Sequence, residues 1–291
     1  ISLDHVTVEF GRGKNRFRAV DDVSLTINKG SIYGIIGFSG AGKSTLVRTM
    51  NVLQRPTSGT VTFNGTTIST LGEGRLLPLR RKIAMIFQHF NLMPSRTVLD
   101  NVTLPLIHEK VSRKDARAKA MHLLELVGIA DKAKAYPRQL SGGQQQRVAI
   151  ARALITKPSL VFADEPTGNL DSVSSAEVLS FLKRSVKELG QTVIMVTHDA
   201  VAASYADRAI VFADGQIVAD EQRPTAESMN QLLMNERERA TQLVGGPSAG
   251  TTVPRPPVAA LKGHTEKASF VPGAPSVPGA PQHAAVAQHR R

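Results

Sequence analysis

Short buried strands alternate with amphipathic helices along most of the chain. Apolar and β-branched runs predict strands at Ser31 to Ile36, Ile83 to Phe87, Leu160 to Ala163 and Thr192 to Val196. Apolar side chains at helical spacing predict one helix after the first strand and another before the last. Their apolar faces carry Leu46, Met50 and Leu53 in the first helix, and Val178, Leu182, Val186 and Leu189 in the second. This alternation predicts an α/β fold with a mostly parallel sheet covered by helices.

Two predicted hairpins add an antiparallel β part. One joins Thr60 to Phe63 with Thr66 to Ile68 around Asn64-Gly65, and the other joins Ala209 to Phe212 with Gln216 to Val218 around Asp214-Gly215. The segment from about 91 to 138 reads as helical, and we expect it to be an inserted subdomain.

The composition changes near residue 244. From Gly246 to Arg291, 13 of 46 residues are Pro or Gly, and a short Val-Pro-Gly-Ala-Pro repeat occurs twice. Such a segment has too little apolar surface to offset the entropy of ordering it. We therefore predict one domain over residues 1–244 and a disordered, basic, Pro/Gly/Ala-rich tail over residues 245–291.

The charge and the remaining composition exclude few classes of function. The net charge of +12 is compatible with nucleic acid, with an anionic membrane surface, or with a generally basic soluble protein. No apolar run approaches the roughly 20 residues needed to span a bilayer, and the N-terminus lacks the design of a signal peptide. The chain contains no Cys and begins with Ile1 rather than Met, so we expect a reducing compartment and a few residues upstream.

A glycine-rich loop follows the first predicted strand and opens a helix. Residues Gly37 to Ser44 match the phosphate-binding pattern G-x-x-x-x-G-K-[ST]. Its glycines allow backbone N–H groups to surround phosphates, and the helix N-terminus adds partial positive charge. Lys43 would neutralise the β- and γ-phosphates, and the Ser44 hydroxyl would ligate Mg²⁺. By itself the loop indicates a nucleotide-binding kinase, GTPase or ATPase.

Two adjacent acids end a second predicted strand. Asp164 and Glu165 follow the apolar run that starts at Leu160, at the edge where open α/β sheets bind ligands. Asp164 would hold Mg²⁺, and Glu165 would act as the general base that activates water. Helix capping is the alternative role for such acids.

A second anion-binding pattern decides the class. The run Leu140 to Arg147 reads LSGGQQQR and precedes a helix, so it offers a hydroxyl, N–H groups and a helix dipole. Here the chain resembles the ABC ATPase family, whose signature is LSGGQ. The resemblance implies that Ser141 and Gly143 contact the ATP held by a second subunit, and hence a head-to-tail homodimer with ATP and Mg²⁺ as cofactors.

The resemblance carries further residues over to this chain. Gln88 matches the glutamine that contacts Mg²⁺, water and the permease. His198 matches the switch histidine beside the γ-phosphate, and Asp171 the aspartate of the loop that crosses the dimer interface. Phe10 lies where the family stacks an aromatic ring on adenine, although Phe10 as a core residue, with Phe17 nearby, stays open. Within the phosphate loop, the nucleotide contacts implied are Gly37, Ser39, Gly40, Gly42, Lys43, Ser44 and Thr45.

Different parts of the chain resemble two different subfamilies. Residues 1 to about 154 resemble methionine-import ATPases, and residues from about 155 to 235 resemble lipoprotein-release and macrolide-export ATPases. The segments that carry these likenesses are Tyr33 to Arg48, Leu53 to Gly59, Ile86 to Leu92 and Ser95 to Val98 for the first, and Ala163 to Asp171, Val196 to Asp199 and Tyr205 to Arg208 for the second. Methionine importers usually carry a C-terminal methionine-sensing domain, where this chain has only a predicted helix at Thr225 to Leu243 and the tail. We therefore do not expect methionine to inhibit it through this subunit.

The combined prediction is the ATP-hydrolysing subunit of an ABC transporter at the cytoplasmic face of the cell membrane. Its partners would be a second copy, an integral membrane permease and, for an importer, a substrate-binding lipoprotein. Methionine or amino-acid import is preferred because the part that grips the permease lies in the importer-like half; release or export is the alternative. A nucleic-acid or ribosome-associated ABC ATPase is a remote alternative, since there is one motif set and no long heptad run. A non-catalytic cassette would lack Lys43, Glu165 or His198, and all three are present.

Overall fold

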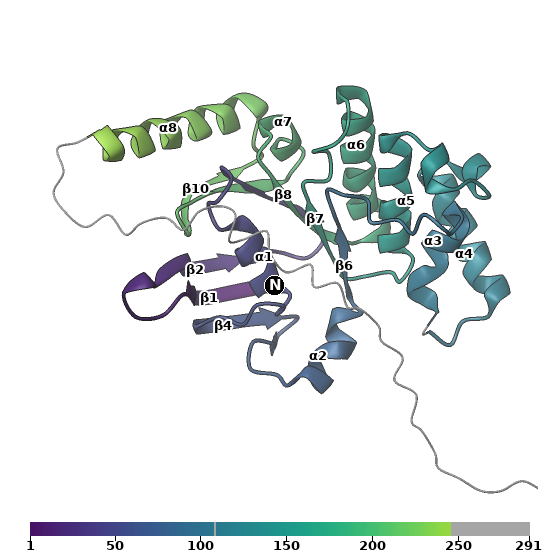
Figure 1. Cartoon of the computed structure of the whole chain (residues 1–291), viewed down its shortest axis with the longest axis horizontal. Coiled ribbons are helices and arrows are strands. Elements are labelled where there is room, and N and C mark those ends of the chain that lie inside the picture. The colour runs from purple at the N-terminus through teal and green to yellow at the C-terminus, as the bar shows by residue number, and fades with distance from the viewer. Residues whose placement is uncertain (108, 246–291) are drawn as a thin grey trace, which may run out of the picture. The chain divides into compact units, whose positions relative to one another are not determined.

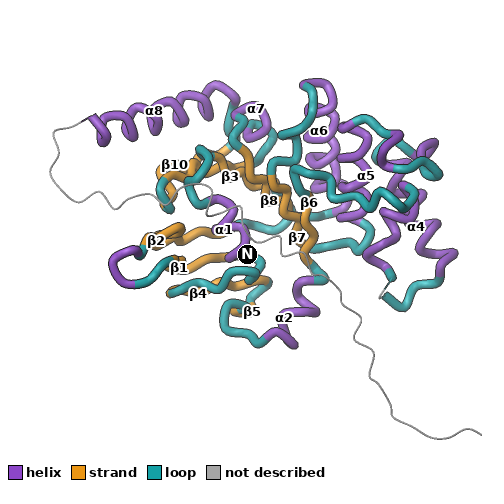
Figure 2. Tube along the Cα trace, viewed as in Figure 1, coloured by secondary structure: helices purple, strands orange, loops and turns teal. Residues whose placement is uncertain are grey.

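Two β-sheets organise the part of the chain that the computed structural model describes, residues 1–107 and 109–245 (Figure 1). Apart from Gly245, the predicted tail lies outside the described residues. Figure 2 shows the strands of both sheets between the flanking helices.

A six-stranded sheet forms the centre of the described residues. Its strand order is β10-β9-β3-β8-β7-β6. The bounds are β3 Ile32–Ile36, β6 Ile83–Ile86, β7 Leu160–Asp164, β8 Thr192–Thr197, β9 Arg208–Ala213 and β10 Gln216–Gln222. Five of these strands run parallel, and β10 pairs antiparallel with β9. Every residue of β3 and β8 is buried, as expected for strands covered on both faces, and the predicted parallel sheet is confirmed.

A smaller antiparallel sheet has the order β2-β1-β4-β5. Its strands are β1 Ser2–Phe10, β2 Phe17–Thr26, β4 Ser58–Phe63 and β5 Thr66–Thr67, with the short helix η1 Gly13–Asn15 between the first two. The antiparallel part and both predicted hairpins are confirmed. The first two strands are not predicted from the sequence, because register shifts interrupt their alternation and His5 and Asp22 have φ angles of 48° and 53°.

Five helices surround these sheets: α1 Lys43–Met50, α2 Glu73–Arg80, α6 Ser172–Leu189, α7 Ala200–Ala203 and α8 Ala226–Gly245. Leu46 and Met50 of α1 are buried as predicted, but Leu53 is wrong as a core residue. The helix ends at Met50 and the chain turns at Val52, which has a φ of 56°, so Leu53 is 61% exposed. Leu189 at the end of α6 is likewise exposed.

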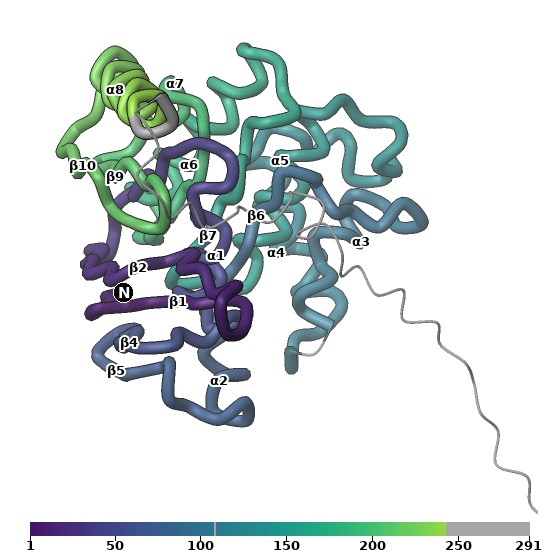
Figure 3. The backbone as a smooth tube through the Cα atoms, turned by 60° about the vertical axis from the view of Figure 1, so that its left-hand side comes forward, coloured from purple at the N-terminus to yellow at the C-terminus, as the bar shows by residue number. Residues whose placement is uncertain are grey.

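The predicted helical subdomain is inserted between β6 and β7. It consists of α3 Val98–Thr103, η2 Leu104–Leu106, α4 Arg113–Leu126, η3 Ala130–Lys132, η4 Pro137–Gln139 and α5 Gly142–Leu154. The helical part therefore continues beyond the predicted end at 138 into α5, whose buried face belongs to the same apolar core as α3 and α4. Figure 1 and Figure 3 both place the antiparallel sheet on one side of β6 and β7, and α3 and α4 on the other.

Within the described ranges, no helix combines the length and the apolar character required to cross a bilayer.

Candidate functional site

Four predicted site segments converge at the carboxyl edge of the six-stranded sheet. The register pairs Ile36 with Thr197, Asp164 with Val196, and Ile86 with Ala163. The chain therefore leaves β3, β8, β7 and β6 at one edge, into the segments that carry the glycine-rich loop, His198, Glu165 and Gln88. Open α/β sheets bind their ligands at this edge.

The glycine-rich loop is packed so tightly that glycine is required at two positions. A Cβ on Gly37 would lie 2.1 Å from the carbonyl oxygen of Phe212, and one on Gly42 would lie 2.1 Å from that of Ala19. Gly42 also has a φ of 102°, in the region that disfavours side chains. The loop is thus fixed against β9 and β2 by its backbone.

Lys43 lies inside the curl of this loop. Its Nζ donates hydrogen bonds to the carbonyl oxygens of Gly37 at 2.6 Å and Phe38 at 2.9 Å. Burial lowers the pKa of Lys43, while the nearby Glu165 and Asp164 act in the opposite direction. An ammonium group held in this way is positioned to meet anionic oxygen atoms that enter the loop.

The helix that follows the loop presents unpaired N–H groups. No side chain caps the N-terminus of α1, where Gly42 is the N-cap. Ser39, Gly40 and Ser44 are exposed and Thr45 is half-buried, so their polar groups line an open surface. This end can therefore accept an anion through the helix dipole and its free N–H groups.

Asp164 is the first of two adjacent acids at the end of β7. Burial raises its pKa, and the neighbouring charge of Glu165 raises it further, while Lys43 and Arg48 oppose this. Carboxylate, hydroxyl and amide oxygen atoms are hard donors, which are the ligands that Mg²⁺ prefers. The donor chemistry of Ser44, Gln88 and Asp164 therefore fits a magnesium ion.

Glu165 is held in a strained backbone conformation by three contacts. Its φ is 49°, and its N–H donates to the carbonyl of Val196 at 2.8 Å. Its Oε1 lies 2.8 Å from Nδ1 of His198, and its Oε2 accepts a hydrogen bond from the Thr197 hydroxyl at 3.3 Å. A left-handed non-glycine residue costs of order 1–3 kcal/mol and often marks a functional site. Thr197 is not among the residues predicted from the sequence; its position next to His198 is the only local signal for it.

Gln88 lies against the turn that follows Glu165. A Cβ on Gly168 would be 2.9 Å from Nε2 of Gln88, so glycine leaves room for this side chain. Asn169 donates its Nδ2 to the carbonyl oxygen of Gln88 at 2.9 Å. The glutamine segment and the loop that leads to Asp171 are therefore in direct contact within one chain.

The signature residues lie at the start of α5, which packs against the start of α6. Ser141 caps α5, accepting a hydrogen bond from the Gln144 N–H, while the Gln144 side chain accepts one from the Ser141 N–H. A Cβ on Gly143 would lie 2.7 Å from Oγ of Ser174. Asp171 caps α6, and hydrogen bonds from the Ser174 N–H and hydroxyl lower its pKa. Helices α1 and α5 lie apart in Figure 1 and Figure 3.

Phe10 lies at the end of β1 and faces Phe17 at the start of β2. Their ring centroids are 5.6 Å apart with planes at 29°, and both rings are partly buried. Phe10 also packs against the core under the antiparallel sheet. Phe10 is therefore partly a core residue, and the stacking of its ring on adenine stays a prediction.

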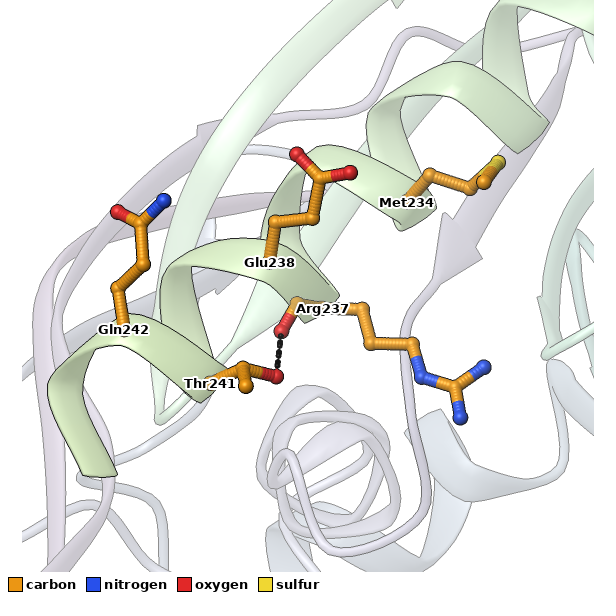
Figure 4. A pocket seen from close by; sticks show the side chains of 5 residues that line it. All are labelled: Met234, Arg237, Glu238, Thr241 and Gln242. Carbon is orange, nitrogen blue, oxygen red and sulfur yellow. Dashed lines mark hydrogen bonds between the residues drawn. The ribbon is translucent and has the colours of Figure 1, made fainter. Parts of the chain in front are cut away.

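A separate concavity of about 470 Å³ lies along α8. It is lined by Met234, Arg237, Glu238, Thr241 and Gln242, and the Thr241 hydroxyl donates to the Arg237 carbonyl at 2.9 Å (Figure 4). None of the predicted site residues is among these lining residues.

Comparisons with known proteins agree with these geometric observations. A family described as ABC transporter matches residues 20–168. The chain is 50% identical over 228 residues to methionine import ATP-binding protein MetN 1 of Lactiplantibacillus plantarum, covering 78% of this chain and 64% of that protein. It is 49% identical over 253 residues to methionine import ATP-binding protein MetN of Bifidobacterium longum, covering 85% of this chain and 63% of that protein. The chain therefore spans just under two thirds of the length of these relatives.

Solved structures show the same fold. A dimeric ATP-binding cassette in a post-hydrolysis state, bound to ADP and Pi, is 39% identical with a TM-score of 0.70, covering 76% of this chain and 98% of that one. The structure of cbiO1 from Clostridium perfringens, part of the ABC transporter complex cbiONQ, is 26% identical with a TM-score of 0.72, covering 84% of this chain and 97% of that one.

Proposed function

We propose that this chain, which belongs to the ABC transporter family, binds and hydrolyses Mg·ATP and thereby drives a separate membrane permease. The observation that carries the proposal is that Lys43, Glu165 and His198 lie at one edge of the sheet. Glu165 contacts His198, and its negative charge acts to raise the pKa of Lys43. In this proposal, residues 1–244 form the ATPase domain.

The phosphate loop binds the nucleotide. Lys43 neutralises the β- and γ-phosphates, and the N–H groups from Gly37 to Thr45, with the Ser39 hydroxyl, surround their oxygen atoms. Phe10, backed by Phe17, offers a ring face on which adenine stacks. The tight packing of Gly37 and Gly42 supports this role, since it preorganises the loop.

The acids and the glutamine serve the hydrolytic step. Ser44, Gln88 and Asp164 hold Mg²⁺, which when bound supplies charge neutralisation at the phosphates. Glu165 accepts a proton from the attacking water as general base. His198 orients the Glu165 carboxylate and contacts the γ-phosphate. The contact of 2.8 Å between the two side chains supports the orienting role of His198.

The complete site requires a second copy of the chain. Ser141 and Gly143 would close over the ATP held by the partner's phosphate loop, and Asp171 would lie at the interface between the copies. The separate placement of α1 and α5 within one chain supports this arrangement, as do the dimeric cassettes of similar fold. One chain alone would bind ATP but hydrolyse it poorly.

Methionine is the substrate we propose for the transporter. The printed names of several relatives, methionine import ATP-binding proteins that are 43–50% identical, support this choice, and so does the importer-like first half of the chain. The permease would hold the subunit at the cytoplasmic face of the membrane, and a substrate-binding lipoprotein would deliver methionine outside. Nucleic acid has no part in this function.

Reconstitution tests the proposal. The full chain is incorporated into proteoliposomes with the permease encoded beside its gene and with the purified binding lipoprotein. ATP-dependent accumulation of labelled methionine, absent with Lys43→Met, is the expected result. A four-helix permease with a large extracellular domain as the neighbour, or transport in the opposite direction, would favour release or export instead. ATP turnover that depends on added nucleic acid would overturn the transport assignment.

A further inference from the structure

The segment that carries Gln88 has neither helix nor strand, yet side chains from other elements hold its backbone. It lies between β6 and α3, and its carbonyl groups lack the donors that helix or strand pairing would supply. Asn169, from the turn after β7, provides one of them to the Gln88 carbonyl. Two further side chains hold the rest of the segment.

Asn101 of α3 holds the second half. This side chain is fully buried, and its Nδ2 donates to the carbonyl oxygens of Met93, Arg96 and Thr97 at 3.1, 3.1 and 3.0 Å. Its Oδ1 accepts a hydrogen bond from the Met93 N–H at 2.8 Å. The second half of the segment is therefore fixed to α3.

Arg152 of α5 holds the first half. Its Nη1 donates to the carbonyl oxygen of Asn91 at 2.6 Å, and its Nη2 to that of Phe90 at 2.9 Å. Asn91 has a φ of 50°, a left-handed conformation that asparagine tolerates better than most residues. The guanidinium fork thus binds two consecutive carbonyl groups of this segment, shortly after Gln88.

An arginine that served only for packing at this position would be energetically unfavourable. Burial lowers the pKa of Arg152, although a guanidinium stays charged at neutral pH. Among the described residues, no ion pair includes Arg152, and its guanidinium donates instead to the two backbone carbonyls. Desolvating a cation without an acid partner costs free energy, which an apolar side chain at this place would avoid.

We infer that Arg152 is a positioning residue for ATP hydrolysis, which joins the signature helix α5 to the Gln88 segment. The inference rests on the proposed function, in which Ser141 at the start of α5 faces the partner's ATP and Gln88 faces the chain's own Mg²⁺. Arg152 keeps these two ends in a fixed relation, so that closure of the dimer sets the position of Gln88.

Replacement of Arg152 in the full chain tests this role. Arg152→Met keeps much of the length and removes both donors; kcat should fall about tenfold or more, since small displacements of positioning groups have such effects. The Kd for ATP should stay within about twofold, because the Lys43 loop is untouched. Arg152→Lys keeps the charge but replaces the planar, two-armed guanidinium by a single ammonium group on a different stem, and it should restore kcat only in part.

A matched control is available in Arg80. This arginine is also partly buried and donates its Nη2 to a backbone carbonyl, that of Val52 at 2.9 Å, but it lies at the other end of β6. Arg80→Met should lower the melting temperature and leave kcat within about twofold of wild type, because its contacts do not reach the Gln88 segment.

A double-mutant cycle with Gln88→Ala separates positioning from general destabilisation. If Arg152 acts through Gln88, kcat of the double variant should be close to that of Gln88→Ala alone. The inference would be overturned if the fold-loss in kcat of the double variant were the product of the two single losses. It would also be overturned if Arg152→Met had the same kcat as Arg80→Met. A wild-type chain that neither binds nor hydrolyses ATP would instead overturn the proposed function, and this is seen before any variant is compared.

Discussion

The imidazole Nδ1 of His198 lies 2.8 Å from Oε1 of Glu165, across the ends of two neighbouring parallel strands. A carboxylate accepts hydrogen bonds, so Nδ1 is the donor in this contact. The imidazole is 65% exposed whereas the carboxylate side chain is only 16% exposed. The pair therefore combines a fixed, shielded acid with an accessible ring, as a base and a phosphate-sensing group require.

Glu165→Gln should bind ATP and form dimers but turn ATP over at least about a hundredfold more slowly, because an amide cannot accept the proton of water. ATP binding by calorimetry, dimer formation by light scattering and phosphate release provide the measurements. Glu125→Gln, on the exposed face of α4, is the matched control and should keep the native rate. Native turnover by Glu165→Gln would exclude this residue as the base.

Thr197→Val should lower kcat roughly threefold to tenfold at unchanged KM. The buried Thr197 hydroxyl donates to Oε2 of Glu165 at 3.3 Å and accepts from the Asp199 N–H at 3.0 Å, so its loss frees the carboxylate. Steady-state kinetics and melting temperatures provide the measurements. Thr192→Val is the control, since Thr192 is a buried threonine at the other end of the same strand that accepts from the Gly30 N–H. Equal kcat in the two variants would show that the Thr197 contact has no part in turnover.

Gly42→Ala should weaken ATP binding at least about tenfold and destabilise the chain by more than about 1 kcal/mol. The added Cβ would meet the Ala19 carbonyl at 2.1 Å, and φ is 102° at this position. Gly74→Ala is the matched control in α2, where nothing lies within 4 Å of the added carbon; it should stabilise the chain by about 0.5–1 kcal/mol. Chemical denaturation and ATP titration measure both effects, and a Gly42→Ala variant with native affinity would show that the loop does not bind the phosphates.

Asp171→Asn should cost stability at neutral pH, and this cost should vanish in acid. Hydrogen bonds from Ser174 lower the folded-state pKa of Asp171 below its ordinary value of 3.8. A lowered carboxyl pKa stabilises the fold above the unfolded-state pKa, and this stabilisation is lost as the pH falls through the folded-state pKa. The free energy of unfolding, measured by urea denaturation from pH 7 to pH 3, should therefore show a gap between wild type and variant that closes at low pH.

Glu188→Gln provides the control at the other end of the same helix. A negative charge near a helix C-terminus opposes the helix dipole, so its removal should not reduce stability at neutral pH. If the difference in the free energy of unfolding between wild type and Asp171→Asn were independent of pH, the carboxylate charge would not stabilise α6.

The sequence predicts the parallel sheet, the loop and the family, because each rests on local patterns. Strands buried on both faces read as apolar runs, and their carboxyl ends must share an edge, so Lys43, Glu165 and His198 could be expected together. The fold class and membership of the ABC transporter family are confirmed. The roles of the site residues stay predictions, and the substrate stays a proposal.

Other features could not be predicted because they depend on backbone irregularity or on distant contacts. Bulges at His5 and Asp22 interrupt the alternation of apolar and polar residues in β1 and β2, so this pattern does not predict the two strands. The turn at Val52 exposes Leu53. The contacts of Arg152 span 61 and 62 residues along the chain and end on backbone carbonyls, which have no side-chain signature in a sequence.

Mixing two inactive variants tests most directly whether two copies of this chain complete each ATP site. Lys43→Met removes the phosphate-binding amine and Ser141→Arg obstructs the signature, so each variant alone should be inactive. In a mixed head-to-tail dimer, one site combines an intact Lys43 with an intact Ser141. An equimolar mixture should therefore recover up to about a quarter of the wild-type ATPase rate. A mixture that stays inactive while mixed dimers form, or a Ser141→Arg variant that hydrolyses ATP at the native rate by itself, would contradict the account.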